Sequence, residues 1–459
     1  MLANEVLVGD ALTRMAEIPD GWAHVAVTSP PYYGLRQYLA KGHPDRAKEI
    51  GSEPTPDEYI ETLLGVFRGV RRILRDDGQF WLNMGDSYGS GEVGRHDRSD
   101  GCVSEYAIGR TSQGKRTTVS LETGVPAGCQ LLMPHRLALA MIADSWCLRS
   151  TVIWSKASPM PESVSGWRWR RCRVKVRSAA RIYRNDSQKP VAAYDGKDFA
   201  RNEYEPCPGC KKCIPNGGYV LRRGKWRPTN SFEYLFQFSK GGDYFGDGDA
   251  VAEASIYGSS GLKPKKRGEF GDKGTDPSMA GREPFKAITE TRNPRSVWTF
   301  PNEPFKGKHF ATYPSSLPKR CIEASTSKAG CCANCGAQYA PVVESVRKPT
   351  RPGITNVLDD TGSAKLDTER HVTANIVTDY RGTCDHTAGP IVPCRVFDPF
   401  LGSGQTARAA HWLGRTWLGC ELNQAYADLV PGRIAKKPKW ADEKYTATVA
   451  VYPDAEVAA

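Results

Sequence analysis

The 459-residue sequence has no apolar run of about 18 residues, so it offers no transmembrane helix. Its opening stretch, MLANEVLVGDALTRM, lacks the basic and then apolar layout of a secretory signal. No segment is repeated along the chain. We therefore expect a cytoplasmic protein that does not contact a membrane, folded as one large domain or as two to three smaller ones.

Acidic residues are outnumbered in this chain. The 51 Asp and Glu stand against 63 Lys and Arg, which gives a formal net charge of +12 and a pI near 9.0. A basic surplus of this size favours a polyanionic partner. Between residues 167 and 189, nine Arg or Lys residues occur with one acid, Asp186. From about residue 160 to 290, long apolar periods are scarce, so composition sets this region apart from its flanks.

Apolar strands and amphipathic helices alternate on both sides of the basic region. A short apolar run at 24–28 predicts a strand, and apolar positions at helical spacing predict a helix over 56–75. A helix at about 134–144 and a strand at about 147–154 continue the pattern, and the stretch 231–240 is again strand-like. This alternation favours a doubly wound α/β sheet.

A Gly-rich turn lies near the C-terminus, in VFDPFLGSGQTARAAHWLG. The order is an apolar strand, a turn with Gly402 and Gly404, a helix, and a second strand that ends at Glu421. Such a turn lets backbone approach a ligand, and an acid after the next strand can bind ribose hydroxyls. A third glycine and a GK[ST] motif are lacking, which argues against NAD and ATP. The pattern predicts a nucleoside-bearing cofactor other than NAD or ATP. The alternative is a plain βαβ unit that binds no cofactor.

A pair of prolines, Pro30 and Pro31, follows the strand at 24–28 in the stretch VTSPPYYGLR. Proline fixes φ and restricts the residue before it, so the pair makes a rigid corner. Alone, this corner indicates only a turn at the end of a strand. Together with the Gly-rich turn near the C-terminus, the proline corner can also hold a substrate group in a fixed position.

The stretches TSPPY and DPFLGSGQT together resemble the DNA amino-methyltransferases, which transfer a methyl group from S-adenosylmethionine (SAM) to cytosine N4 or adenine N6 in double-stranded DNA. GDAL, HFATYPSSLPKRCIEAS and GCELN match as well. The catalytic motif precedes the cofactor motif, as in the circularly permuted β-type branch. The resemblance implies a Rossmann-like α/β methyltransferase sheet, and it covers residues 4–37, 75–88, 130–162, 229–240 and 293–430.

The resemblance also implies roles for individual residues. The family tetrapeptide is Ser29, Pro30, Pro31 and Tyr32 in this chain. The Ser29 hydroxyl and the Pro30 carbonyl accept the N–H hydrogens of the target amine, and Tyr32 stacks on the base, which leaves the duplex. The implied SAM pocket consists of Asp10, His309, Thr312, Pro314, Asp398, Pro399, Phe400, Gly402, Ser403, Gly404 and Glu421.

The identity of the target base stays open between two exocyclic amines. Serine in the first tetrapeptide position favours cytosine N4, although serine also occurs in some adenine-N6 enzymes of this type. Methylation at cytosine C5 needs a cysteine after a proline, and TSPPYY offers none. An inactive zinc-bearing DNA-binding protein and an RNA or protein-glutamine methyltransferase are the other candidates; an Asn-Pro-Pro-Tyr tetrapeptide would favour the last.

Two of the cysteine clusters have the spacing of zinc sites. Fourteen cysteines in a cytosolic chain do not indicate a disulfide framework. The stretch CPGCKKC supplies three cysteines and needs one more ligand for a tetrahedral site, for which we expect Cys172. The second cluster combines CCANCG with TCDH, and there Cys331 or Cys394 could substitute as a ligand. We expect structural zinc rather than free thiols at both sites. The predicted ligands are Cys172, Cys207, Cys210 and Cys213, and Cys332, Cys335, Cys384 and His386.

The basic region has the composition of a DNA-contacting surface, although a solvated charged face would look the same. The resemblance assigns target recognition to this variable region. We divide the chain into a catalytic part at 1–160, a basic insert with a zinc knuckle at 161–290, and a SAM-binding part at 291–459 with a zinc-ribbon-like insertion at about 330–390. The candidate DNA contacts are Arg168, Arg170, Arg171, Arg173, Lys175, Arg222, Arg223, Lys225 and Arg227.

Overall fold

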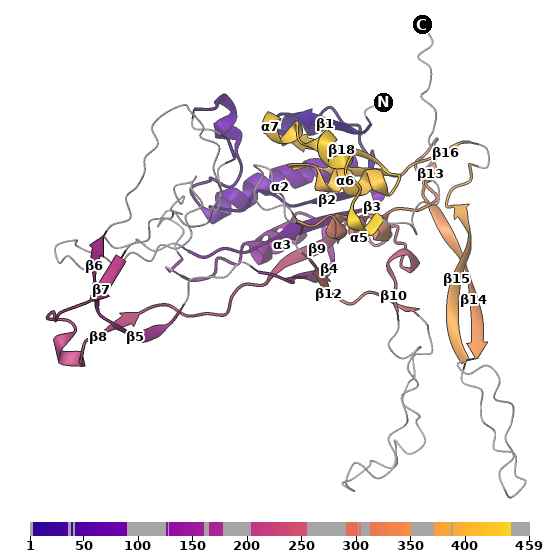
Figure 1. Ribbon diagram of the computed structural model, residues 1–459. Coiled ribbons are helices and arrows are strands. Elements are labelled where there is room, and N and C mark those ends of the chain that lie inside the picture. The colour runs from indigo at the N-terminus through magenta and orange to yellow at the C-terminus, as the bar shows by residue number, and fades with distance from the viewer. Residues whose placement is uncertain are drawn as a thin grey trace, which may run out of the picture. The chain divides into compact units, whose positions relative to one another are not determined.

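The computed structural model describes residues 3–34, 38–39, 42–89, 125–126, 128–159, 165–177, 203–254, 291–301, 303, 313–349, 371–386 and 389–441 (Figure 1). The chain forms two compact units. The large unit comprises Met1–Gly89, Arg116–Ser158 and Phe232–Ala459, and the small unit comprises Ser90–Lys115 and Pro159–Ser231.

An eight-stranded sheet organises the large unit, in the order β1-β18-β17-β2-β3-β9-β4-β12. All neighbouring strands are parallel except where β9 pairs with β3 and β4, so β9 alone runs antiparallel. The strands are β1 (Glu5–Val8), β2 (Ala23–Thr28), β3 (Leu74–Met84), β4 (Cys147–Lys156), β9 (Phe232–Ser239), β12 (Val297–Phe300), β17 (Arg395–Asp398) and β18 (Thr416–Glu421).

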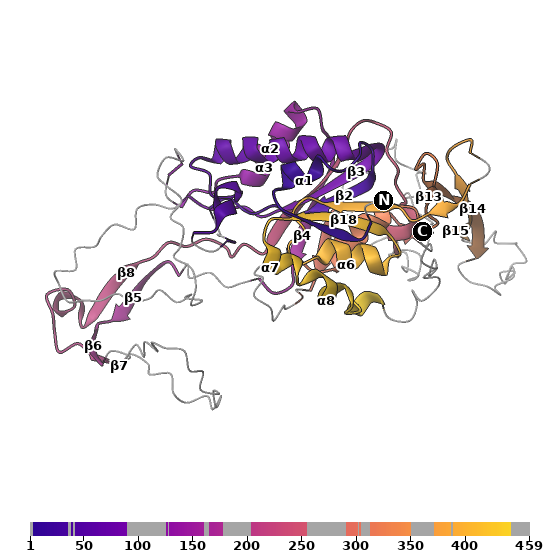
Figure 2. The same cartoon turned by 90° about the horizontal axis from the view of Figure 1, so that it is seen from above.

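Helices cover both faces of this sheet (Figure 2). On the first face, Met15, Phe67 and Met141 pack against Phe80 and Phe238 of the sheet. A second buried cluster on the other face joins side chains of three helices to residues of the sheet. The first face carries α1 (Ala11–Met15), α2 (Pro56–Ile73) and α3 (Met133–Ala143); the second carries α5 (Ser316–Ser325), α6 (Gln405–Trp412) and α8 (Val430–Ile434); α7 (Gln424–Ala427) follows β18.

Helix α2 shows how local sequence sets these elements. The hydroxyl of Thr55 accepts a hydrogen bond from the backbone N–H of Glu58, and Pro56 occupies the first turn. Acidic residues lie in the first turn and basic residues in the last, which suits the helix dipole. The buried residues recur at helical spacing, so one stripe of the helix faces the sheet.

The segment between α5 and β17 adds a small layer outside the sheet. Strand β13 (Cys331–Cys332) pairs with β16 (Ile391–Val392), and β14 (Tyr339–Pro349) pairs with β15 (His371–Gly382) in a long antiparallel ribbon.

Strands β10 (Glu253–Ala254) and β11 (Thr291–Arg292) form a further pair. Short 3-10 helices lie at Pro44–Lys48, Ile214–Asn216, Asp249–Val251 and Lys439–Ala441. Among the helices described, none is long and apolar enough to cross a membrane.

Two antiparallel ribbons form the described part of the small unit. Strand β5 (Trp167–Arg171) pairs with β8 (Tyr219–Arg223), and β6 (Arg173–Arg177) pairs with β7 (Glu203–Pro206). Backbone hydrogen bonds from Cys172 to Gly218 and from Cys207 to Cys172 join the two ribbons.

The α/β sheet predicted from the sequence is confirmed. The predicted helix over 56–75 is α2, and the strand-like stretch 231–240 is β9. The sequence did not predict that β9 pairs between β3 and β4 in the main sheet, inside the range that we assigned to the insert. Pairing partners depend on contacts between distant segments, which local periodicity does not encode.

Candidate active site

Polar side chains gather at the carboxyl edge of the parallel strands, on the second face of the sheet. Along each strand, alternate residues point to this face, where they join the second buried cluster. At the edge, the next residue in that alternation is polar on six neighbouring strands. In spatial order these residues are Glu421 on β18, Asp398 on β17, Ser29 after β2, Asn83 on β3, Glu233 on β9 and Lys156 on β4.

Asp398 is the most buried of these acids, with 1% of its surface exposed. One carboxylate oxygen accepts hydrogen bonds from the Thr28 hydroxyl (2.5 Å) and the Phe400 N–H (3.0 Å). The other accepts from the hydroxyls of Thr406 (2.6 Å) and Tyr313 (3.3 Å). Burial raises the pKa of Asp398 to about 6, although these hydrogen bonds oppose the rise. The carboxylate therefore joins the end of β2 to the turn after β17.

The Gly-rich turn follows Asp398 and leads into α6. Gly404 has a φ of +86°, and a Cβ there would lie 2.9 Å from the Val430 side chain, so a larger residue would strain the backbone and clash. The N–H of Gly402 donates to Glu421 Oε2 at 2.8 Å, and the N–H of Asn423 donates to Oε1 at 2.8 Å. Burial raises the pKa of Glu421 to about 7.

The Ser-Pro-Pro-Tyr corner lies on the strand next to this turn, because β2 and β17 are neighbours. The Tyr59 hydroxyl of α2 donates to the Pro31 carbonyl at 2.7 Å and holds the corner from the first face. The Ser29 hydroxyl donates to the Tyr32 oxygen at 3.3 Å, and the Tyr32 hydroxyl donates to Glu233 at 2.7 Å. The Ser-Pro-Pro-Tyr corner, with Ser29 partly exposed and Pro30 buried, thus adjoins the Gly-rich turn.

A comparison with protein families matches this chain to a family described as DNA methylase, over residues 23–333 and 395–432. The chain belongs to this N6/N4 DNA methylase family. It is accordingly a SAM-dependent DNA methyltransferase, and the matched ranges include both the Ser-Pro-Pro-Tyr corner and the Gly-rich turn.

Two Type II methyltransferases agree with the family assignment. The Type II methyltransferase M.XycI of Xanthomonas campestris pv. cyanopsidis is 30% identical over 320 residues, which cover 69% of this chain and 71% of the relative. M.SmaI of Serratia marcescens is 26% identical over 437 residues, 94% of this chain and 91% of the relative. A solved cytosine-N4-specific PvuII DNA methyltransferase covers 94% of this chain and 86% of its own, with 12% identity and a TM-score of 0.43.

The remaining residues predicted for the methylase cofactor pocket have different placements. Asp10 accepts hydrogen bonds at 3.0 Å from the N–H and the hydroxyl of Thr13, so it caps α1. Pro314 lies two residues before α5, whereas His309 and Thr312 lie outside the described residues. Sequence reasoning missed Tyr313, whose hydroxyl reaches Asp398. Its position between the matched Thr312 and Pro314 was the only available signal. Pro399, Phe400 and Ser403 all lie in the turn between β17 and α6.

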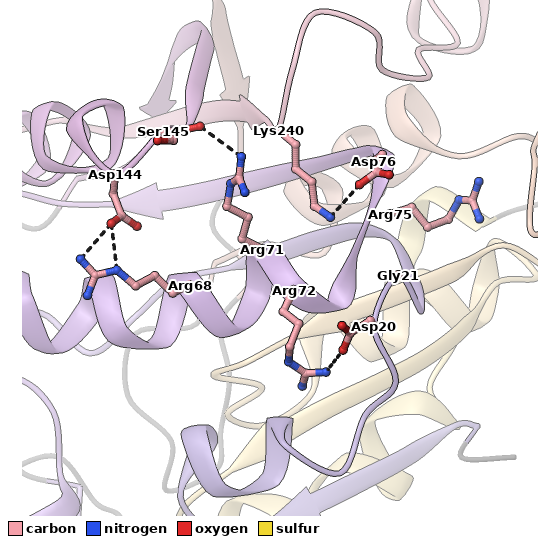
Figure 3. Close-up of a pocket in the computed structure, with 10 residues that line it drawn as sticks. All are labelled: Asp20, Gly21, Arg68, Arg71, Arg72, Arg75, Asp76, Asp144, Ser145 and Lys240. Atoms are coloured by element: carbon pink, nitrogen blue, oxygen red, sulfur yellow. Dashed lines mark hydrogen bonds and ion pairs between the residues drawn. The ribbon is translucent and has the colours of Figure 1, made fainter.

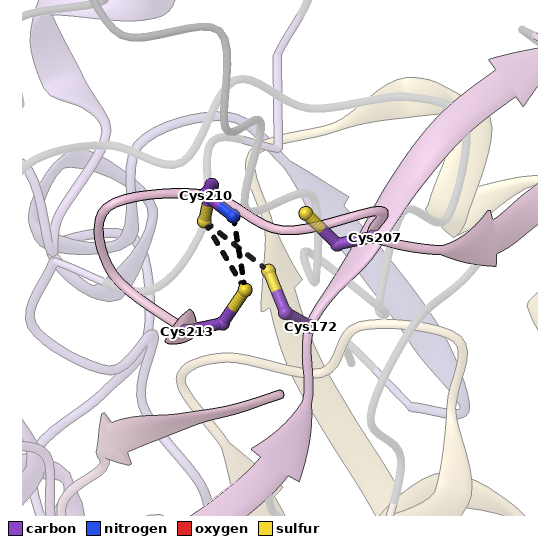
Figure 4. A group of neighbouring side chains, drawn as sticks. All are labelled: Cys172, Cys207, Cys210 and Cys213. Atoms are coloured by element: carbon purple, nitrogen blue, oxygen red, sulfur yellow. Dashed lines mark hydrogen bonds between the residues drawn. The ribbon is translucent and has the colours of Figure 1, made fainter. Parts of the chain in front are cut away.

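The first cysteine cluster comes together at the junction of the small unit's two ribbons (Figure 4). The sulfur of Cys210 lies 3.8 Å from that of Cys172 and 3.5 Å from that of Cys213. With Cys207, all four sulfurs lie within 4.8 Å of one another. Backbone N–H groups, that of Lys212 first, lower the pKa of the Cys210 thiol to about 7.

The second cluster lies in the layer outside the main sheet. The ligand atoms of Cys332, Cys335, Cys384 and His386 also lie within 4.8 Å of one another. Backbone N–H groups of Cys335 and Asn334 lower the pKa of Cys332. The structure thus brings together the predicted members of each cluster.

A third group, His24, Cys331 and Cys394, was not predicted. The His24 Nε2–H donates to the Gly336 carbonyl at 2.8 Å, and Nδ1 accepts the Arg395 N–H at 2.9 Å. Because both ring nitrogens are bonded to backbone, His24 has no lone pair left for a metal. It ties the second cluster to β17 instead.

A basic hollow lies at the opposite, amino-terminal edge of the strands (Figure 3). Three of its cations are paired with acids of the hollow, among them Arg68 with Asp144 at 2.8 Å and Lys240 with Asp76 at 3.1 Å. Arg72 pairs with Asp20. This pairing compensates much of the positive charge, and the hollow contains none of the residues predicted for the active site.

Asp398→Asn tests the joining role of this carboxylate. The asparagine amide has one acceptor oxygen and one NH2 group in place of two acceptor oxygens. At least one of the buried groups that donate to Asp398 therefore loses its acceptor. We expect the free energy of unfolding to fall by about 2 kcal/mol and SAM binding to weaken. Urea unfolding and titration calorimetry measure these effects. The control is Asp428→Asn, an exposed acid bonded to Gln424; equal stability of the two variants would contradict the role.

Proposed function

We propose that this methyltransferase modifies the N4 amine of cytosine in double-stranded DNA. The observation that supports this proposal is serine at the head of the tetrapeptide, one strand away from the Gly-rich turn. Adenine N6 is the second candidate, because the family acts on both amines. The Type II methyltransferase relatives support a role in restriction and modification.

The proposed chemistry starts from a weak nucleophile. The lone pair of an exocyclic amine is delocalised into the ring, and SAM supplies an electrophilic methyl group. The Ser29 hydroxyl and the Pro30 carbonyl accept the two N–H hydrogens, which turns the nitrogen toward sp³ geometry and frees its lone pair. Two prolines hold these acceptors still, so little reorganisation is needed at the moment of transfer.

The cofactor side of the proposed site uses the turn and its flanking acid. Backbone of Gly402 and Gly404 lies along the methionine end of SAM, and Glu421 accepts the ribose hydroxyls. Asp398 acts differently, because each of its oxygens already accepts two hydrogen bonds from protein groups, whereas each Glu421 oxygen accepts one. We assign Asp398 to positioning the turn and the corner.

We infer structural zinc at both four-residue clusters. A zinc–sulfur bond of about 2.3 Å in a tetrahedral site places sulfurs about 3.8 Å apart, and Cys172 and Cys210 lie at that separation. Each cluster offers four ligands, which suits a structural site and leaves no open position for catalysis.

We propose that the β5–β8 ribbon of the small unit contacts DNA through one of its two faces. Cross-strand pairing places Arg168 opposite Arg222, and Arg170 lies on the same face. On the other face, Arg223 lies over the Trp167 ring at 4.9 Å and Arg171 over Tyr219 at 5.3 Å. We assign the phosphate contacts to the first face. Arg173, Lys175, Lys225 and Arg227, outside this ribbon, stay candidates.

The decisive experiment supplies tritiated SAM and duplex DNA and then identifies the labelled nucleoside. We expect N4-methylcytosine, and we expect Ser29→Ala and Pro30→Ala to lower transfer at least about a hundredfold while SAM still binds. Ser345→Ala, in the β14–β15 ribbon, is the control and should leave transfer unchanged. Label in N6-methyladenine would refute the cytosine assignment, and no label in DNA would favour an inactive DNA-binding protein.

Elemental analysis tests the zinc sites. We expect about two zinc ions per chain, with one lost in Cys210→Ser and one lost in Cys335→Ser. Cys129→Ser, at an exposed cysteine outside both clusters, should keep both ions. A metal-free preparation with full activity would contradict the assignment.

Salt-dependent binding tests the arginine face of the β5–β8 ribbon. Each of Arg168→Gln, Arg170→Gln and Arg222→Gln should weaken DNA binding and reduce the slope of log K against log salt by about 1, because one phosphate contact is lost. Lys328→Gln, an exposed cation of the large unit, should leave the slope unchanged. Unchanged slopes in all three ribbon variants would refute the proposed contacts.

A further inference from the structure

Three polar residues outside the tetrapeptide form a network with Ser29 and Tyr32. Asn83 Nδ2 donates to Glu233 Oε2 at 2.8 Å, to the Tyr32 oxygen at 3.1 Å and, at a longer 3.4 Å, to the Ser29 oxygen. Lys156 Nζ lies 2.5 Å from Glu233 Oε1. The Glu233 and Lys156 side chains are only 13% and 26% exposed, so this ion pair is largely shielded from water.

The network has a fixed direction, because it ends on a carboxylate that can only accept hydrogen bonds. The Tyr32 hydroxyl gives its hydrogen to Glu233 at 2.7 Å. The Tyr32 oxygen is then an acceptor, and the Ser29 hydroxyl donates to it at 3.3 Å. Burial, and then the charge of Glu233, raise the pKa of Tyr32 well above its ordinary value, so its hydroxyl keeps the proton that it donates.

The local backbone is shaped for this contact. A Cβ at Gly85 would lie 2.9 Å from the Tyr32 ring and 3.4 Å from Glu233. A side chain at this position would force the Tyr32 ring to shift. The approach therefore depends on Gly85, next to the end of β3.

The direction of the Ser29 hydroxyl decides what it can do to an amine. A hydroxyl can donate or accept a hydrogen bond. If Ser29 donated to the target nitrogen, it would engage the lone pair that must attack the methyl group. With its hydrogen on Tyr32, Ser29 presents only lone pairs to the amine.

We propose that Glu233 is a positioning residue that acts through Tyr32 to fix Ser29 as a hydrogen-bond acceptor for the target amine. Lys156 and Asn83 hold the carboxylate in place. This inference rests on the proposed role of Ser29 in transfer, and it gives Tyr32 a task for its hydroxyl in addition to the stacking of its ring.

A double-mutant cycle on methyl transfer tests the inference. Single-turnover rates are measured at saturating SAM and duplex DNA for the wild type, Tyr32→Phe, Glu233→Ala and the double variant. We expect each single variant to slow transfer about tenfold, because each loses one hydrogen bond of the network. The dissociation constants for SAM and DNA should not change. The double variant should also be about tenfold slower, because both changes break one chain.

Other outcomes have separate meanings. A double variant about a hundredfold slower would show that Glu233 and Tyr32 act independently and would overturn the inference. Should Glu233→Ala fail to fold, Tyr32→Phe alone decides, since it removes one oxygen and keeps the ring; an unchanged rate would refute the proposal. A wild-type enzyme without transfer would instead refute the proposed function.

A matched ion pair on α5 provides the control. Glu323 lies 2.6 Å from Lys319, with side-chain exposures of 10% and 17% for the acid and the lysine. Glu323, in the last turn of α5, lies outside the hydrogen-bond network of the tetrapeptide, and Glu323→Ala removes a similarly shielded carboxylate from a lysine. We expect it to leave the single-turnover rate unchanged, so a tenfold loss in Glu233→Ala reports position rather than the loss of any shielded ion pair.

Discussion

The candidate active site depends on one buried carboxylate, Asp398, which accepts four hydrogen bonds. Its donors come from the end of β2, the turn after β17, the start of α6 and the segment before α5. Thr28 and Asp398 are 370 residues apart in the chain, yet their side chains lie 2.5 Å apart. Because Thr28 directly precedes Ser29, this contact sets the corner that we propose for the target amine against the turn that we propose for the methyl donor.

Strand order explains why the motif order in the sequence can be permuted without loss of the site. The N-terminal strand β2 lies between β17 and β3, so the last motif of the chain is adjacent in space to the first. All parallel strands present their carboxyl ends at one edge, and β9 begins there because it runs the other way. Glu233, near the start of an antiparallel strand, is thereby placed among residues that end parallel ones.

The sequence predicted the parts whose signal is local, namely the Gly-rich turn, the proline corner and the alternation of α2 with its strands. It also grouped cysteines that the structure brings together, although Cys172 is 35 residues from Cys207. Glu233, Asn83 and Lys156 were missed, because each is one polar residue at the end of an apolar strand. That these residues are neighbours becomes evident only once strand order and register are known. His24 was missed for the same reason, since its two backbone partners are 312 and 371 residues away.

Charge is distributed differently on the two sides of the corner. Burial raises the pKa of both Asp398 and Glu421, and in the described part of the chain neither carboxylate has a cationic partner. A sulfonium cofactor brings a positive charge to that side. Glu233, on the other side, already has Lys156 at 2.5 Å. Its charge is compensated within the protein, so in the proposed network it directs the Tyr32 hydroxyl without competing for the methyl donor.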